Sequence, residues 1–134
     1  MTPPPVWVLA LAVAAGGAGG AVCRFGVSLL AAAVVPRAAW LGTLAVNLAG
    51  CVLIGAALSV QGDRDPLGPA GRAAAVTGFL GGLTTFSTFG AEAVALGSRD
   101  GGGPVAALQV GLNVAGGLLC VWCGRRLGAT IFGG

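Results

Sequence analysis

The chain has 134 residues, of which 56% are hydrophobic and only 8% are charged. Soluble domains carry about 25% charged residues, so this chain lacks the polar surface of a soluble enzyme, and we expect no enzyme activity. Its net charge of +3 comes from scattered arginines, whereas nucleic-acid binding needs a clustered basic face, so no nucleic-acid partner is expected. The 26 glycines among apolar residues let helices pack closely in lipid. The composition predicts an all-α integral membrane protein.

Four apolar blocks follow one another, and each has about the 20 residues that one membrane span needs. The first, residues 6–35, contains Arg24 and ends at Pro36, which cannot continue a helix. No positive segment precedes it, so we interpret it as the first span rather than as a signal peptide. The second block, residues 40–60, contains no charged residue. A single membrane domain over residues 1–134 is expected.

The third block, residues 73–96, is interrupted by Gly78, Gly81 and Gly82. Four hydroxyl residues follow, namely Thr84, Thr85, Ser87 and Thr88. This composition disfavours a regular helix in lipid. Irregular backbone is tolerated at membrane depth only where protein or a polar cavity satisfies the freed groups. We therefore predict a broken third helix whose carbonyls face an ion, as in transporters with unwound helices.

The fourth block, residues 104–124, starts at Pro104, a favoured first helical residue, and is expected to end before Arg125. Four spans would place the loop arginines on two sides, and the side with more of them stays cytoplasmic. One side would hold Arg64, Arg72, Arg125 and Arg126, and the other Arg37, Arg99 and, as a possible third, Arg24. This small excess predicts insertion in both orientations.

Each of the last three blocks has one mildly polar stripe at helical spacing. The stripes consist of Thr43, Asn47 and Cys51; of Thr85, Phe89 and Glu92; and of Gln109, Asn113, Gly117 and Cys120. Such stripes suit a shared polar pathway, but they equally suit interhelical hydrogen bonds. For single Ser and Thr residues we favour hydrogen bonding, and for Asn47 and Asn113 a functional role. The four cysteines are interpreted as small apolar residues.

Two charged residues fall inside apolar blocks. Arginine near a helix centre costs roughly 2.5 to 3.5 kcal/mol, so Arg24 is expected to face a water-filled vestibule or a group of carbonyls. The alternative places Arg24 at the membrane interface, at the end of a shorter first helix. Glu92 has the same two options, a vestibule or a helix end in water.

These residues resemble the Fluc (CrcB) family of microbial fluoride channels, and the resemblance covers nearly the whole chain. The shared motifs are residues 19–25 with Arg24; Gly42, Thr43, Asn47, Gly50 and Cys51; and Gly78, Gly81, Gly82, Thr84, Thr85, Phe86, Ser87, Thr88, Phe89 and Glu92. The resemblance implies a four-helix subunit in the cell (cytoplasmic) membrane. It also implies an antiparallel, dual-topology dimer with two pores, formed with an identical chain or with a homologous one.

The resemblance also implies site residues. The carbonyls of Gly81 and Thr84 would hold a structural sodium ion at the dimer centre. The fluoride pathway would contain Phe86 and Phe89, which point ring edges at the ion, Asn47, which donates its amide, and Thr43, Thr85, Ser87, Thr88 and Asn113. Arg24 and Glu92 would lie in the vestibule. The family often has Tyr and Ser where this chain has Gln109 and Asn113.

A small multidrug-type, proton-coupled antiporter is the alternative function, because it also has four short spans. It would need a membrane-buried carboxylate, and the first block contains no acidic residue. Only Glu92 could serve. A helical scaffold subunit without transport is a third possibility, in which the polar stripes could be made apolar without loss.

Overall fold

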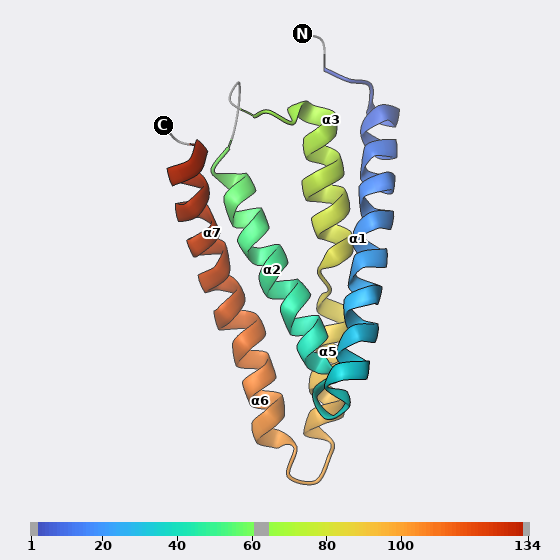
Figure 1. Cartoon of the computed structure of the whole chain (residues 1–134), viewed down its shortest axis with the longest axis vertical. Coiled ribbons are helices and arrows are strands. Elements are labelled where there is room, and N and C mark those ends of the chain that lie inside the picture. Colours follow the sequence, from blue (N-terminus) through green and yellow to red (C-terminus); the bar gives the residue numbers. More distant parts are fainter. Residues whose placement is uncertain (1–2, 61–64, 133–134) are drawn as a thin grey trace.

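The computed structural model describes residues 3–60 and 65–132, and all regular structure in these ranges is helical. Four segments there are long and apolar enough to span a membrane: Val6–Val34, Trp40–Leu58, Gly68–Gly97 and Gly103–Phe132. They run side by side, with both chain ends at the same end of the molecule (Figure 1). The prediction of an all-α, multi-pass membrane protein is confirmed, whereas the antiparallel dimer stays a prediction.

Helix α1 (Val6–Val34) continues without interruption past Arg24. It stops where Pro36 forces the preceding Val35 out of the helical region, to φ −130° and ψ 61°. The alternative of a shorter first helix that ends near Arg24 is therefore wrong, because nothing between Arg24 and Val34 breaks a helix. A single 3-10 turn, η1 (Pro36–Ala38), then leads into α2 (Trp40–Leu58).

The third membrane segment is broken, as the glycine and hydroxyl residues predict. It consists of α3 (Gly68–Arg72), the π-helical segment η3 (Ala73–Leu80), the single turn α4 (Gly81–Leu83) and, after the break, α5 (Phe86–Gly97). At the break Thr84 has ψ 154°, and Thr85 has φ −151° and ψ 121°. Two successive residues are thus extended, and the chain leaves the helical path between them.

The fourth segment comprises α6 (Gly103–Gly111), the π-helical segment η4 (Leu112–Gly116) and α7 (Gly117–Phe132). Gly101, with φ 70°, makes the turn before it in a conformation that favours glycine. We expected this span to end near Gly124, but the helix continues to Phe132. Arginine is a good helix former, and Arg126 packs over the Trp122 ring at 5.2 Å instead of ending the helix.

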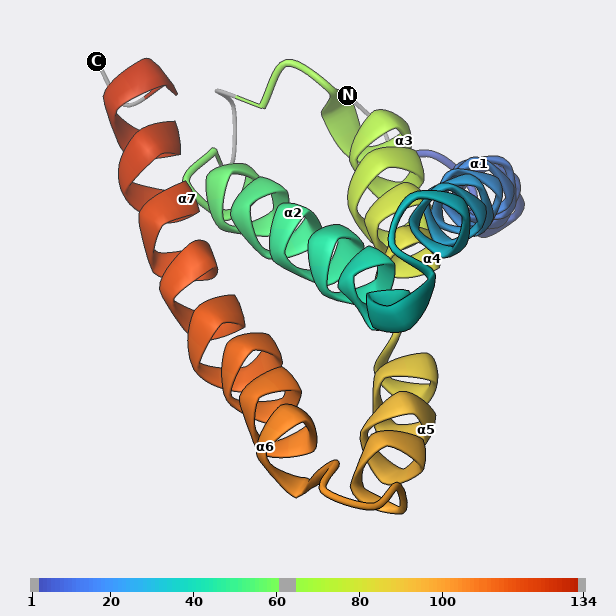
Figure 2. The same ribbon diagram turned by 60° about the horizontal axis from the view of Figure 1, so that its bottom comes forward.

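Glycines hold the helices in two closely packed pairs, α1 with η3 and α4, and α2 with α7 (Figure 2). A Cβ atom at Gly20 of α1 would overlap the carbonyl oxygen of Phe79, and one at Gly124 of α7 would overlap that of Val52. These helices therefore touch through their backbones, the arrangement that small residues permit in lipid. A small apolar cluster of Val46, Leu80 and Leu83 joins the pairs.

Helix α5 stands apart from both pairs (Figure 2). Its neighbours are mainly α6 and, to a smaller extent, α2. Leu96 and Phe89 are its only buried apolar residues among those that the structure describes. Polar contacts therefore contribute a large part of what fixes its position.

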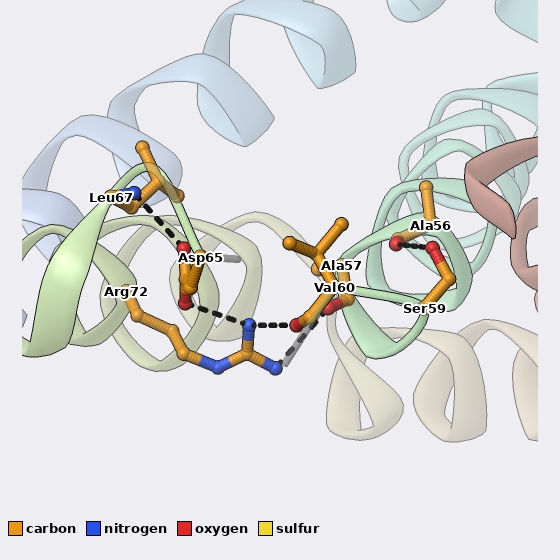
Figure 3. Close-up of polar contacts among 7 residues, drawn as sticks. All are labelled: Ala56, Ala57, Ser59, Val60, Asp65, Leu67 and Arg72. Atoms are coloured by element: carbon orange, nitrogen blue, oxygen red, sulfur yellow. Dashed lines mark hydrogen bonds and ion pairs between the residues drawn. The ribbon is translucent and has the colours of Figure 1, made fainter. Parts of the chain in front are cut away.

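Arg72 ties the start of the third segment to the end of the second (Figure 3). Its guanidinium donates to the carbonyl oxygens of Val60 at 2.9 Å and Ala57 at 3.2 Å, and it forms an ion pair with Asp65 at 3.2 Å. The carbonyls at the end of a helix lack partners within the helix, and a cation there also interacts favourably with the helix dipole. Arg72 thus caps α2 from the neighbouring segment.

The backbone contact at Gly20 predicts a sharp difference between two glycines of α1. Gly20→Ala should lower the free energy of unfolding by about 1 to 3 kcal/mol, because its methyl group meets backbone atoms that cannot move aside. Gly26→Ala is the matched control, since a Cβ there meets nothing within 4 Å. Reversible unfolding in mixed micelles measures both, and equal stabilities would contradict the packing of α1 against η3 and α4.

Candidate functional site

The break in the third segment is bonded to the side chain of Asn47 on α2. The Thr85 N–H donates to Asn47 Oδ1 at 2.8 Å, and Asn47 Nδ2 donates to the Thr85 carbonyl oxygen at 3.1 Å. This pair of hydrogen bonds is termed the amide bridge below. The Thr85 hydroxyl also caps α5, since it accepts from the Thr88 N–H at 3.2 Å. Side chains therefore satisfy both backbone groups of Thr85 at the break, as predicted for irregular backbone at membrane depth.

Arg24 reaches the same break from α1. Its Nε donates to the Gly82 carbonyl oxygen at 3.1 Å, and the residue is half-buried. In a continuous helix this carbonyl would accept from the N–H four residues later, which lies beyond the break. Of the two surroundings expected for Arg24, a group of carbonyls or a water-filled vestibule, the structure shows a single carbonyl partner, and the vestibule stays a prediction.

The three polar stripes meet in one network of side chains. Glu92 accepts from the Thr43 hydroxyl at 2.8 Å and from Gln109 Nε2 at 3.0 Å. Asn113 Oδ1 accepts from Asn47 Nδ2 at 2.9 Å, and Asn113 Nδ2 donates to the Gln109 carbonyl at 3.1 Å. The alternative of a helix-end carboxylate in water is wrong for Glu92, because it lies inside α5 with both oxygens bonded. The network runs without a gap from Thr43 to Thr85.

Gln109 is the residue of this network that the sequence did not single out as a site. It is fully buried, and its Oε1 is the one buried side-chain oxygen or nitrogen in the described ranges without a hydrogen-bond partner. Its position one turn before Asn113 on the same stripe was the available signal. Its pairing with Glu92 could not be read from the sequence, because the two residues lie 17 positions apart in the chain.

Phe86 and Phe89 are in contact, with ring centroids 5.4 Å apart and planes at 69°. Their surroundings differ: Phe89 is 7% exposed, whereas Phe86 is 81% exposed in the single chain. Two further residues of the hydroxyl run also meet here, because the Thr85 hydroxyl lies 3.1 Å from that of Thr88 and 3.3 Å from that of Ser87. The predicted cluster of rings and hydroxyls is thus assembled at the start of α5.

An open cavity of about 550 Å³ lies beside the break. Seven of its lining residues are predicted site residues: Asn47, Gly81, Thr84, Thr85, Phe86, Phe89 and Asn113. Most of its lining is apolar, and its polar side chains are amides and hydroxyls together with the thiol of Cys51. No group of three or more His, Cys, Asp or Glu residues that could hold a metal occurs in the described part of the chain. A cation at this site would find only uncharged oxygens, those of the backbone and of amide and hydroxyl side chains, among the residues that line the cavity.

The family described as "CrcB-like protein, Camphor Resistance (CrcB)" matches residues 11–125 of the chain. The chain belongs to the CrcB family. Its motifs in the first three spans were sufficient to predict this membership. Helix α7 and the π-helical segment η4, which those motifs do not include, fall largely within the matched range.

Curated relatives of this CrcB chain carry the name fluoride-specific ion channel FluC. The relative from Pseudomonas putida F1 is 45% identical over 120 residues, which cover 89% of this chain and 95% of the relative. That from Stutzerimonas stutzeri is 43% identical over 119 residues, 89% and 95% of the two chains. That from Chloroflexus aurantiacus is 44% identical over 124 residues, 92% and 97%. The family is one of ion channels, and the expectation that the chain is not an enzyme is confirmed.

The bonds to Glu92 predict energetic coupling between α2 and α5. Thr43→Val should lower the free energy of unfolding by about 1 to 3 kcal/mol, because it removes the hydrogen bond to Glu92 and leaves that carboxyl oxygen without its donor. In a Glu92→Ala background the same change should cost far less, since the acceptor is gone. Ser28→Ala is the control, as the Ser28 hydroxyl bonds only within its own helix, to Arg24 O at 3.0 Å. Equal costs of Thr43→Val in both backgrounds would contradict the coupling.

Proposed function

We propose that the chain is the subunit of a fluoride channel that lets fluoride leave the cytoplasm and lowers its toxic concentration there. The relatives named as fluoride-specific channels support this function over most of the chain. The observation that carries it is the mostly apolar cavity beside the helix break, in which the only polar groups are uncharged, and where aromatic rings, amides and hydroxyls gather among the residues that line it. Such a lining suits a small, strongly hydrated anion that must exchange its water for other donors.

The pathway in this proposal uses neutral ligands. Aromatic ring edges carry the positive part of the quadrupole, and the exposed edge of Phe86 beside Phe89 offers it to an anion. Amides and hydroxyls add donors without a fixed charge. The proposed pathway residues are Thr43, Asn47, Thr85, Phe86, Ser87, Thr88, Phe89 and Asn113. Conduction needs ligands that also release the ion, which favours such groups over a cation in the filter.

The existing hydrogen bonds of Asn47 determine how it could bind fluoride in the proposed pathway. Asn47 Nδ2 already donates to two oxygens, those of Thr85 and Asn113. Donation to fluoride therefore replaces one of these bonds rather than using an idle hydrogen. The Asn113 oxygen is the partner whose loss leaves the amide bridge intact.

Arg24 and Glu92 flank this region as vestibule residues, with Arg24 raising the local concentration of anions.

A second copy is part of the proposal, because the chain leaves the cavity open and Phe86 uncovered. In an antiparallel dimer, formed with an identical or a homologous chain in the cell membrane, the two breaks would face each other. The carbonyls of Gly81 and Thr84 would then hold a structural sodium ion. Backbone oxygens are ligands that suit hard cations, and both residues line the cavity, so the residues present fit this ion. When bound, the ion would supply a fixed positive charge beside the carbonyls of Gly81 and Thr84.

Fluoride flux through variants with one pathway residue replaced tests the proposed pathway. Phe86→Ile and Phe89→Ile each remove a positive ring edge, and Asn47→Ala removes an amide donor, so each should lower fluoride efflux from liposomes at least about tenfold. Phe25→Ile is the matched control, because Phe25 is 65% exposed on α1 and does not line the cavity. Each protein is first shown to be folded and dimeric. Wild-type flux in all three variants would leave the pathway without support.

The small arginine bias predicts both orientations in one membrane. We expect a cysteine at position 66 (Pro66→Cys, with the four native cysteines replaced) to react with an impermeant reagent in about half of the copies in intact cells. Pro66 is exposed in the connection before α3, so access does not limit the reaction. Labelling of all copies or none would exclude a same-chain antiparallel dimer and would favour a heterodimer.

A further inference from the structure

The hydrogen bonds around the break show where the helix stops and what takes its place. In an α-helix each carbonyl accepts from the N–H four residues later. The Thr84 N–H still follows this pattern, since it donates to the Leu80 carbonyl at 3.1 Å. The next N–H in the series, that of Thr85, should donate to Gly81. It donates instead to Asn47 Oδ1, at 2.8 Å.

The amide of Asn47 is complementary to an extended residue. In extended backbone the N–H and C=O of one residue point to the same side, and a primary amide offers one acceptor and one donor at a matching separation. Thr85 has these dihedral angles, φ −151° and ψ 121°. If the amide were rotated by 180°, Nδ2 would face the Thr85 N–H, donor against donor, and Oδ1 would face the Thr85 carbonyl, acceptor against acceptor. The bond from Asn47 Nδ2 to Asn113 Oδ1 favours the same orientation.

The bridge has a consequence for the carbonyls at the end of α4. The Gly82 carbonyl is taken by Arg24, and that of Leu80 by Thr84. The Gly81 carbonyl lies between them, and the N–H that a continuous helix would bring to it is held by Asn47. Gly81 is exposed and lines the cavity. Its oxygen therefore lacks its helical donor at the place where the proposed function needs a cation ligand.

We propose that Asn47 is the positioning residue of the helix break: its side chain holds Thr85 extended through the amide bridge and so keeps the Gly81 carbonyl free of its helical donor. Only the use of that carbonyl by a cation rests on the proposed function. The role in the break stands on the two hydrogen bonds alone. Asn47 thus acts on the backbone of another helix, in addition to any contact with the permeating ion.

The Thr85 amide reports this role directly. In protein labelled with ¹⁵N and ¹³C at threonine, Asn47→Leu should speed hydrogen exchange at Thr85 about tenfold or more, or shift its Cα resonance from extended towards helical, as the N–H returns to Gly81. A tenfold change corresponds to about 1.4 kcal/mol, within the cost of an unpaired buried group. The neighbouring Thr84 amide, bonded to Leu80, should keep its exchange rate. An unchanged Thr85 resonance and exchange rate would overturn the proposal.

Two further variants separate the amide bridge from a general loss of packing. Thr43→Val removes a polar contact from the same helix, one turn away, and should leave Thr85 unchanged. Asn47→Asp keeps an acceptor for the Thr85 N–H in both protonation states, but when ionised it has no donor for the Thr85 carbonyl oxygen. The Thr85 carbonyl ¹³C resonance should therefore shift towards its wild-type position as the pH falls and the carboxyl regains a proton. If Asn47→Leu does not fold, this series decides alone. A Thr85 carbonyl resonance that does not respond to ionisation overturns the proposal.

Stabilisation by sodium provides the second readout. The melting temperature of the wild-type protein should rise with NaCl relative to N-methylglucamine chloride, and Asn47→Leu should require at least about tenfold more Na⁺ for the same rise. No response of the wild type to Na⁺ would remove the sodium ion from the proposed function, while the Thr85 amide would still decide the role of Asn47. Equal Na⁺ responses in both proteins would overturn the link between the amide bridge and the Gly81 carbonyl.

Discussion

Inside a bilayer a backbone group that leaves a helix finds no water to bond with, and each unsatisfied group costs several kcal/mol. At Thr84 and Thr85 the chain avoids much of this cost, because side chains from two other helices supply hydrogen-bond partners. Asn47 on α2 bonds both backbone groups of Thr85, and Arg24 on α1 bonds the Gly82 carbonyl. The break thus exists only where α1 and α2 stand beside it. Much of the remaining structure brings these helices to that place.

Glycine contacts provide that proximity. Gly20 and Gly82 bring α1 and α4 into backbone contact, and Gly55 and Gly124 do the same for α2 and α7. Gly50 of α2 faces the break itself, since a Cβ there would overlap the Thr84 side chain. At this separation the Asn47 side chain spans the space to the Thr85 backbone. Small residues and long polar ones therefore have complementary tasks. The small residues set the spacing of the helices, and the long polar side chains bridge that spacing with hydrogen bonds.

Helix α5 follows a different principle. It has few buried apolar residues and stands away from the glycine-packed pairs (Figure 2). Its Glu92 is bonded to Thr43 and Gln109, which belong to α2 and α6. A carboxylate with both oxygens engaged suits a fixed element of the wall better than the freely exchanging proton carrier of an antiporter. Polar bonding thus defines the half of the molecule in which the proposed pathway lies.

Much of this protein followed from its sequence, because membrane insertion is governed by local composition. Apolar length gave the four spans, Pro36 the end of α1, and the glycine and hydroxyl run the break before Phe86. Helical spacing alone placed Asn47, Glu92 and Asn113 on stripes that proved to face one another. Motifs in the first three spans then indicated the CrcB family.

Other features were decided only by the tertiary structure. The bond between Asn47 and Thr85 joins residues 38 positions apart, and that between Arg24 and Gly82 joins residues 58 apart. Which partner each side chain meets depends on the rotation and spacing of whole helices, which no local pattern encodes. The same holds for Phe86 and Phe89: their spacing puts them on one face, but only the packing of α5 buries one ring and leaves the other exposed.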